Sequence, residues 1–134
     1  MTIRPASLSD LPVLTACDHQ IAPEEMENLI RLGRVLIAEA EGQFSGWLRW
    51  NLFWDNTPFL NLLFLLEPFR GKGYGRDLMI RWEQEMRQLG YDTVMTSTAS
   101  DEFAQHFYRK LGYTAIGGFT PFGDPYELLL AKKL

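Results

Sequence analysis

A glycine-rich segment with three basic side chains is the part of this sequence best suited to holding phosphate. It runs Arg70-Gly71-Lys72-Gly73-Tyr74-Gly75-Arg76 and contains no acidic residue. Glycine adopts backbone angles that other residues disfavour, so a ligand can approach the main chain closely. Arginine can grip a phosphate with two parallel hydrogen bonds. The segment therefore predicts an anion site, and a glycine-rich turn surrounded by solvated cations is the alternative.

The neighbouring sequence predicts a strand before the glycine segment and a helix after it. Phe59–Leu66 is almost entirely apolar, as expected for a strand buried on both faces. Over Gly73–Leu89 the apolar residues recur at helical spacing, namely Leu78, Met79, Trp82, Met86 and Leu89. Free amides and the helix dipole at such a helix start attract anions, which supports the phosphate interpretation.

The rest of the sequence predicts alternating strands and helices. Further strands are expected over Thr2–Ala6, Val35–Ala40, Phe44–Trp54, Thr93–Thr98, Tyr113–Phe119 and Tyr126–Lys132. Further helices are expected after Ser7 or Ser9, over Pro23–Leu32 and over Asp101–Leu111, the last with Phe103, Ala104, Phe107 and Leu111 facing the core. The coarse order is β, α, α, β, β, β, α, β, α, β, β, with no repeat and no linker.

Composition favours a soluble, cytoplasmic protein with one domain over residues 1–134. The formal net charge of −4 argues against binding to nucleic acid or to an anionic membrane, because both need a basic face. The single cysteine, Cys17, cannot form an internal disulfide, which favours a reducing compartment. No apolar run approaches the length of a membrane span, and the N-terminal residues lack an apolar signal core.

Two motifs together carry a resemblance to a known family. Arg70-Gly71-Lys72-Gly73-Tyr74-Gly75 matches the Arg/Gln-x-x-Gly-x-Gly/Ala signature of the GCN5-related N-acetyltransferases, the GNAT superfamily. The stretch Ala104-Gln105-His106-Phe107-Tyr108-Arg109-Lys110-Leu111-Gly112-Tyr113 resembles the Ala-x-x-Phe-Tyr-x-Lys-x-Gly-Phe block of that superfamily. Either motif alone is weak, but both occur in order, separated by one helix and one strand. The element order also resembles the GNAT fold across nearly the whole chain.

The resemblance implies a fold and a cosubstrate. The fold is α+β with α/β layers: a mixed, mostly antiparallel sheet of six to seven strands, flanked by about four helices. Its fourth and fifth strands splay apart, and acetyl-coenzyme A (acetyl-CoA), the acetyl donor, sits in the gap without a metal ion. Pantetheine would contact Leu63, Phe64 and Leu65. The pyrophosphate would lie on the segment formed by Arg70, Gly71, Lys72, Gly73, Tyr74, Gly75 and Arg76.

The resemblance also points to a catalytic residue. Tyr108 occupies the position of the tyrosine that protonates the departing thiolate of coenzyme A. A phenol suits this task, because it is a donor that stays neutral at working pH. The alternative is that Tyr108 only packs between its helix and the sheet.

The base that deprotonates the attacking amine is less clear from the sequence. Some relatives place a glutamate on the fourth or fifth strand, but here the fourth strand offers Asn61 and the fifth offers Thr96, Ser97 and Thr98. We hypothesise a water relay through these side chains, with Glu67 at the strand end as a less favoured direct base. Main-chain amides near the fourth strand would polarise the thioester carbonyl.

A second departure from the family pattern lies three residues before the motif alanine. Relatives often carry a cofactor-binding asparagine there, where this chain has Asp101. Asp101 is a candidate cofactor contact, but Asp is also among the best helix N-caps, and capping is the favoured role.

Other conspicuous residues are interpreted as structural. Cys17 is expected to be a small core residue, and two isolated histidines, His19 and His106, do not make a metal site. The aromatic hairpin residues Trp47, Trp50, Phe53 and Trp54 are expected in the core, on a homodimer surface or along the acceptor pocket.

The acceptor itself is not encoded in a recognisable motif. A primary amine on a small molecule is our first expectation, and a protein or peptide amine is the second. A non-catalytic module that binds or senses coenzyme A is the alternative from a different functional class. A P-loop nucleotide site is disfavoured because no Gly-Lys-Ser/Thr sequence follows the glycines.

Overall fold

The computed structural model describes residues 1–134 and contains four α-helices and seven strands. The helices are α1 (Leu11–Cys17), α2 (Pro23–Arg31), α3 (Tyr74–Gln88) and α4 (Ala104–Lys110), with single 3-10 turns η1 (Leu8–Asp10) and η2 (Glu67–Phe69). The strands are β1 (Thr2–Pro5), β2 (Val35–Ala40), β3 (Gln43–Phe53), β4 (Thr57–Leu65), β5 (Thr93–Ala99), β6 (Thr114–Phe119) and β7 (Glu127–Lys133). The predicted order of strands and α-helices is confirmed.

The strands form one mixed sheet in the order β1-β2-β3-β4-β5-β7-β6. The pairs β1/β2, β2/β3, β5/β7 and β6/β7 are antiparallel. Strands β4 and β5 pair in parallel, with Phe59 opposite Met95 and Leu60 opposite Thr96. This short parallel ladder is consistent with the expected splay between the fourth and fifth strands. The predicted fold class is confirmed.

The chain divides into two compact units that share the long elements. Unit 1 comprises Met1–Asn51 and Leu62–Trp82, and unit 2 comprises Leu52–Asn61 and Glu83–Leu134.

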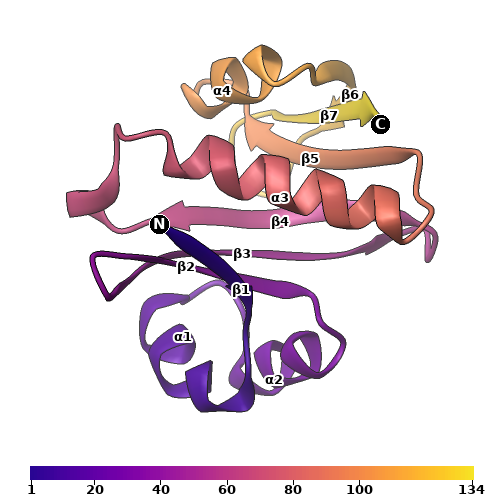
Figure 1. Cartoon of the computed structure of the whole chain (residues 1–134). Coiled ribbons are helices and arrows are strands. Elements are labelled where there is room, and N and C mark those ends of the chain that lie inside the picture. The colour runs from indigo at the N-terminus through magenta and orange to yellow at the C-terminus, as the bar shows by residue number, and fades with distance from the viewer. The chain divides into compact units, whose positions relative to one another are not determined.

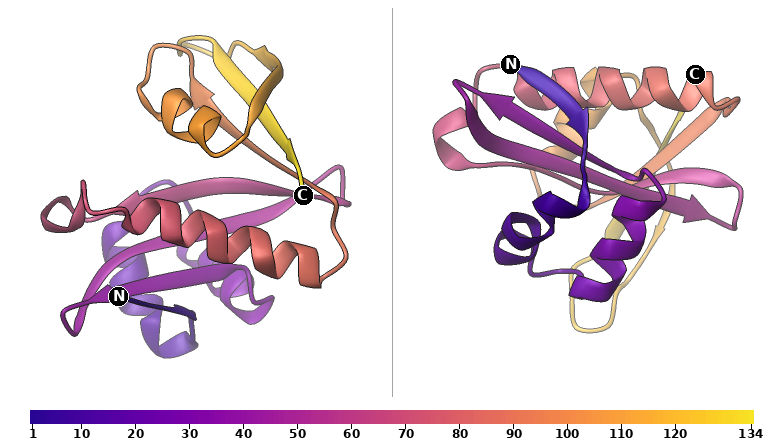
Figure 2. Two further views of the ribbon diagram at one scale, coloured as in Figure 1. Left: turned by 45° about the horizontal axis from the view of Figure 1, so that its top comes forward. Right: turned by 60° about the horizontal axis from the view of Figure 1, so that its bottom comes forward.

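The core of unit 1 lies between two helices and the first three strands. Helices α1 and α2 lie together on one side of β1, β2 and β3 (Figure 1). The buried residues there are Leu14, Met26, Leu29, Ile30, Val35, Ile37 and Trp47. Trp50, three residues after Trp47, faces the other side of β3, where its ring packs against Trp82 of α3 at a centroid distance of 6.4 Å. The first half of α3 therefore covers the opposite side of these strands, as the left view of Figure 2 shows.

Unit 2 places α4 against the strands β5, β7 and β6 (Figure 1). Its buried residues include Val94, Thr96, Tyr108, Tyr113 and Leu130. Val94 and Thr96 alternate with Thr93 and Met95 along β5, so only one face of this strand points toward α4.

Several sequence-based expectations about burial are wrong. β4 is not buried on both faces, because Asn61 is exposed and the Phe64 ring is 39% exposed. Leu89 is exposed because α3 ends at Gln88, before that residue can join the buried face. Trp54 is 80% exposed and so lies outside the core, because β3 ends at Phe53 and the chain turns with a positive φ at Trp54; a homodimer surface or the acceptor pocket stays the prediction for it.

The start of the last helix also differs from the prediction. α4 begins at Ala104 with Phe103 at its N-cap position, so Asp101 lies outside the helix and does not cap it. Phe103 is 89% exposed for the same reason, and it does not face the core. The buried side chain of α4 is Tyr108.

Candidate active site

The glycine segment forms the start of α3 in unit 1. Gly71 and Gly73 have φ of +75° and +84°, a backbone region that residues other than glycine rarely adopt. The amide of Asp77 donates to the Gly73 carbonyl at 3.1 Å, which is the first hydrogen bond of the helix. The amides of Tyr74, Gly75 and Arg76 consequently belong to the first turn, where an α-helix supplies no intrahelical partner. Free amides at a helix start are the arrangement that favours anions in general, which is consistent with the expected phosphate site.

The basic side chains of this segment have different surroundings. Arg70 Nε donates a 2.8 Å hydrogen bond to the Leu65 carbonyl, and its guanidinium lies 5.1 Å from the centroid of the Phe64 ring. Arg70 therefore ties the segment to the end of β4. Lys72 and Arg76 are exposed and available to a charged ligand.

Sequence reasoning missed a residue beside the end of β4. A Cβ placed on Gly46 of β3 would lie 2.5 Å from the Phe64 carbonyl oxygen and 2.7 Å from Leu65 Cδ2. The Phe64 carbonyl oxygen belongs to the backbone and cannot move aside as a side chain could. Strand β3 can therefore approach Phe64 and Leu65 this closely only with glycine at position 46. The available signal was a glycine within an apolar strand, which often marks a close backbone approach.

Tyr108 lies in unit 2 and is almost completely buried, with 7% exposure. Burial raises the pKa of its hydroxyl to about 12, the carboxylate of Glu102 also raises it, and a hydrogen bond with the Thr96 side chain acts in the opposite direction. The ring packs edge to face against Tyr113 at a centroid distance of 5.7 Å. Tyr108 therefore carries its proton near pH 7.

The predicted relay groups lie in distinct environments. Thr96 is buried and donates to the Leu60 carbonyl at 3.0 Å, and Ser97 alternates to the other face of β5. Thr98 Oγ1 lies 3.5 Å from Glu102 Oε2, so this hydroxyl is beside a carboxylate that sequence reasoning did not single out. Asn61 and Glu67 are both exposed, as is Asp101.

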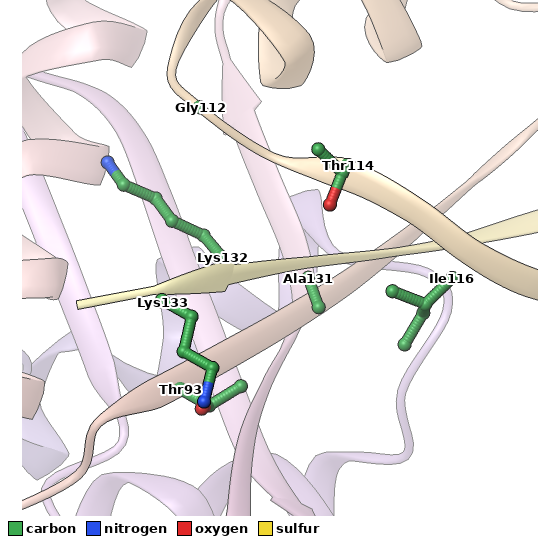
Figure 3. A pocket seen from close by; sticks show the side chains of 7 residues that line it. All are labelled: Thr93, Gly112, Thr114, Ile116, Ala131, Lys132 and Lys133. Carbon is green, nitrogen blue, oxygen red and sulfur yellow. The ribbon is translucent and has the colours of Figure 1, made fainter.

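A buried network behind Tyr108 was also missed. Glu83 of α3 accepts 2.8 Å hydrogen bonds from the Tyr113 hydroxyl and from Lys132 Nζ. The neighbouring Lys132 and Lys133 point to opposite sides of β7, so only Lys132 reaches this carboxylate (Figure 3). The Tyr113 amide in turn donates to the Tyr108 carbonyl at 3.1 Å. The family block has phenylalanine where this chain has Tyr113. The additional hydroxyl was the feature of the sequence that could have indicated a buried hydrogen-bond partner.

Two surface pockets occur within unit 2. One of about 440 Å³ is lined by Thr93, Gly112, Thr114, Ile116, Ala131, Lys132 and Lys133 (Figure 3). The other, of about 400 Å³, is lined by Phe53, Trp54, Thr57, Asp92, Thr93, Met95, Ile116, Leu129 and Ala131. Thr93 and Met95 line the second pocket, and they alternate with Thr96, so this pocket lies on the face of β5 that points away from Tyr108.

No group of three or more His, Cys, Asp and Glu side chains is arranged to hold a metal ion. Cys17 packs against the unit 1 core, as expected for a small apolar residue. None of the helices combines the length and the apolar character that crossing a membrane would need.

Comparison with known proteins decides the family. A family model described as the acetyltransferase (GNAT) family matches residues 7–113, a span that includes both motifs. The chain belongs to the GNAT acetyltransferase family. This GNAT chain is accordingly an acetyltransferase with acetyl-CoA as its donor. No match was found among curated protein sequences.

Solved structures share the fold of this GNAT acetyltransferase over its whole length. A ribosomal-protein-alanine N-acetyltransferase from Brucella melitensis has a TM-score of 0.84 at 24% identity, with 100% of both chains covered. Ard1 from Thermoplasma volcanium has a TM-score of 0.84 at 19% identity, covering 99% of this chain and 97% of that one. PaiA N-acetyltransferase from Thermoplasma acidophilum, in complex with coenzyme A, has a TM-score of 0.79 at 18% identity, covering 99% and 98%.

Proposed function

We propose that this single-domain protein, residues 1–134, transfers the acetyl group of acetyl-CoA to a primary amine of a small molecule by direct attack in a ternary complex. The neutral amine attacks the thioester carbonyl, the C–S bond breaks, and the departing thiolate takes a proton from Tyr108. The amine nitrogen loses one proton to solvent, and Tyr108 regains one from solvent. The products are the amide and coenzyme A with a free thiol.

The observation that carries the proposal is the state of Tyr108. A phenol with a pKa of about 12 is protonated near neutral pH, which is the state a general acid needs before the thiolate departs. Tyr108 is buried, its ring packs against Tyr113, and its backbone carbonyl accepts a hydrogen bond from the Tyr113 amide.

The cosubstrate contacts follow from the geometry of unit 1. Leu63, Phe64 and Leu65 would contact pantetheine, because this end of β4 presents a partly exposed apolar strand. The amides from Gly71 to Arg76 would hold the pyrophosphate at the start of α3. Lys72 and Arg76 would add charge, while Arg70 would position the segment through Leu65.

The proton acceptor for the amine is a water molecule in this proposal. Asn61 and the Thr98 hydroxyl are the relay groups in this proposal, because Thr98 Oγ1 lies beside the Glu102 carboxylate, whereas the Thr96 hydroxyl donates to the Leu60 carbonyl. Glu67 is the competing direct base, and Glu67→Gln tests it. An unchanged pH–rate profile in that variant supports the water relay, and loss of the acidic limb supports Glu67.

The test is a panel of amines assayed by release of the coenzyme A thiol. Small amines and a peptide with a free N-terminus form separate arms, and turnover with small amines only is the expected result. Tyr108→Phe should lower kcat by about 100-fold, in the range typical of general-acid catalysis. Tyr126→Phe, which removes a hydroxyl from a 44% exposed residue, is the matched control.

Two outcomes would replace the proposal with another function. Turnover confined to the peptide arm would assign a protein or peptide amine as the acceptor. Binding of acetyl-CoA by calorimetry without turnover in either arm would assign a coenzyme A sensing module.

A further inference from the structure

Unit 2 has a partly exposed apolar area on the face of its strands that points away from α4. Met95 of β5 pairs with Ala131 of β7, and Leu129 lies two residues before Ala131, so the three side chains share this face. Ile116 of β6 lines the same pocket and is 56% exposed. We call this area the Trp54 patch, and its members are Phe53, Trp54, Met95, Ile116, Leu129 and Ala131.

Trp54 occupies a turn position that favours small residues. The Phe53 carbonyl accepts a hydrogen bond from the Asn56 amide at 3.2 Å, and the residues between them, Trp54 and Asp55, have φ of +54° and +63°. Hairpin turns with two such residues favour Asn-Gly, because a bulky side chain at positive φ is strained. Trp54 is 80% exposed, so burial within one chain offsets little of this strain. Contact with another molecule would offset it.

Neighbouring rings fix the position of the Trp54 indole. It packs against the Phe53 ring at a centroid distance of 4.9 Å, and Phe53 stacks on Phe59 at 5.9 Å. A side chain that is already ordered loses little conformational entropy when a partner covers it. Tryptophan is also among the residues that contribute most to the binding energy of protein interfaces. The ring is therefore well suited to anchor a protein contact.

An apolar pocket of about 400 Å³ lies directly beside this indole. Trp54 and Ile116 line it as exposed residues, and Met95 is buried within it at 7% exposure. Such a volume with an apolar lining suits an aromatic ring. A projecting ring and a pocket that can accept one thus share a single surface. In a two-fold dimer this surface is self-complementary, because each copy inserts its ring into the pocket of the other.

Charged residues beside the Trp54 patch favour the same arrangement. Asp92, just before β5, is an exposed lining residue of the pocket, and Asp55 lies in the turn that precedes β4. Lys133, on the neighbouring strand β7, pairs with Thr93 and extends toward it (Figure 3). A two-fold axis along the strands would place the lysine of each copy opposite an aspartate of the other, which favours this pairing.

We propose that the Trp54 patch is the contact surface of a symmetric homodimer. Trp54 of each copy enters the apolar pocket of the other, and Asp92 of each copy pairs with Lys133 of the other. The inference is independent of the proposed acetyl transfer, because none of these residues takes part in it.

The first test measures the mass and the tryptophan emission of the full chain over a thousandfold range of protein concentration. Sedimentation equilibrium should show a reversible change from one to two copies of the 15.5 kDa chain. The other tryptophans, Trp47, Trp50 and Trp82, are at most 4% exposed. A shift of the emission to shorter wavelength on dimerisation therefore reports the burial of Trp54.

Trp54→Ala should raise the dissociation constant of the dimer by about 100-fold or more, because two anchoring side chains are lost per dimer. Phe122→Ala is the matched control. It removes another fully exposed aromatic ring from unit 2, in the segment between β6 and β7, and should leave the dissociation constant unchanged.

The second test mixes two charge-reversed variants. Asp92→Lys and Lys133→Asp should each weaken self-association, because each places like charges opposite one another in both contacts of the dimer. An equimolar mixture should dimerise as the wild type does, since in the mixed dimer every lysine faces an aspartate. Native mass spectrometry distinguishes the mixed dimer from the two homodimers.

Several outcomes would overturn the proposal. A wild type that stays monomeric at every concentration would leave another protein or an apolar ligand as the occupant of the Trp54 patch. A dimer that Trp54→Ala does not weaken, or a charge mixture that does not restore association, would place the contact elsewhere. Assembly beyond two copies would indicate an open head-to-tail contact in place of two-fold symmetry. The amine panel tests acetyl transfer separately, so the two proposals fail independently.

Discussion

Arg49 Nε donates a 2.7 Å hydrogen bond to Asp18 Oδ2, and both side chains are almost completely buried in unit 1. The same carboxylate oxygen accepts a 3.0 Å hydrogen bond from Trp47 Nε1. Asp18 lies directly after α1, whereas Arg49 and Trp47 lie on β3, so the pair anchors the end of a helix to the sheet. Burial alone would raise the pKa of Asp18, but these two partners hold it below its usual value.

Asp18→Asn should destabilise the protein by about 3–5 kcal/mol, because it leaves the buried Arg49 charge without a counterion. Urea denaturation measures the change. Arg31→Ala is the matched control, since Arg31 and Glu27 form an exposed pair at 3.7 Å that contributes at most about 0.5 kcal/mol. A similar loss in both variants would contradict the assignment of an anchoring role to Asp18.

Stability should fall in acid partly through Asp10. Hydrogen bonds from Arg4 lower the pKa of Asp10 to about 2, and this value is below that of an unfolded Asp, about 3.9. The contribution of the ionised Asp10 to the free energy of unfolding is therefore complete above about pH 4 and is lost as the pH falls toward 2. Because Arg4 is 40% exposed and screened by solvent, we expect about 1 kcal/mol.

Asp10→Asn should remove this part of the pH dependence. Urea midpoints of the variant and the wild type, measured between pH 2 and pH 7, should converge in acid. A constant difference between the two proteins over that range would show that the Arg4 contact does not depend on the charge of Asp10.

Removing the Tyr113 hydroxyl should weaken unit 2. Tyr113→Phe takes one of two charge-assisted donors from the buried Glu83 carboxylate, at a cost of about 1–3 kcal/mol in the free energy of unfolding. Tyr91→Phe removes a hydroxyl from a half-buried residue and should change stability by less than about 0.5 kcal/mol. Urea denaturation measures the free energy of unfolding of both variants and the wild type. If Tyr113→Phe is as stable as Tyr91→Phe, the hydrogen bond from Lys132 is sufficient for the Glu83 carboxylate.

Gly46→Ala should impair both stability and coenzyme A binding. Its Cβ would meet the Phe64 carbonyl oxygen, so overpacking should cost about 1–3 kcal/mol and displace the proposed pantetheine contacts. Gly118→Ala in β6 is the matched control, because its Cβ would likewise lie close to a backbone oxygen, 2.4 Å from the Glu127 carbonyl of β7. Calorimetry should show weaker coenzyme A binding in Gly46→Ala but not in Gly118→Ala.

Gly73→Ala should weaken binding of coenzyme A but not of pantetheine, which lacks the pyrophosphate. At φ of +84° a side chain strains the backbone that presents the amides, and about 1 kcal/mol corresponds to a roughly fivefold loss of affinity. Gly42→Ala, at a positive φ of +72° in the turn between β2 and β3, is the control. Equal losses for both ligands would argue against a pyrophosphate site.

The sequence predicted the order of strands and α-helices because glycines at helix ends and the periodicity of apolar residues are local signals. Gly33, Gly90 and Gly112 all have positive φ, as expected at helix ends. The prediction failed where burial depends on distant atoms. Phe64 and Phe103 are as apolar as the buried Phe69, yet both are exposed. The assignment of Asp101 as an N-cap failed because capping depends on which residue first adopts helical angles.

What the sequence determined by itself was the family and the order of strands and α-helices, since residue types and spacing within a helix turn or a loop need no partner from elsewhere. Only the tertiary structure decided the environment of each group. Thr96 and Thr98 are equivalent in a strand pattern, but Thr96 donates to Leu60 while Thr98 lies beside Glu102. Contacts such as those of Asp18 with Arg49 and Glu83 with Tyr113 join residues about 30 positions apart. Hydrogen bonds and desolvation act over a few ångströms in space, and the pairing of distant segments is set by the packing of the whole chain.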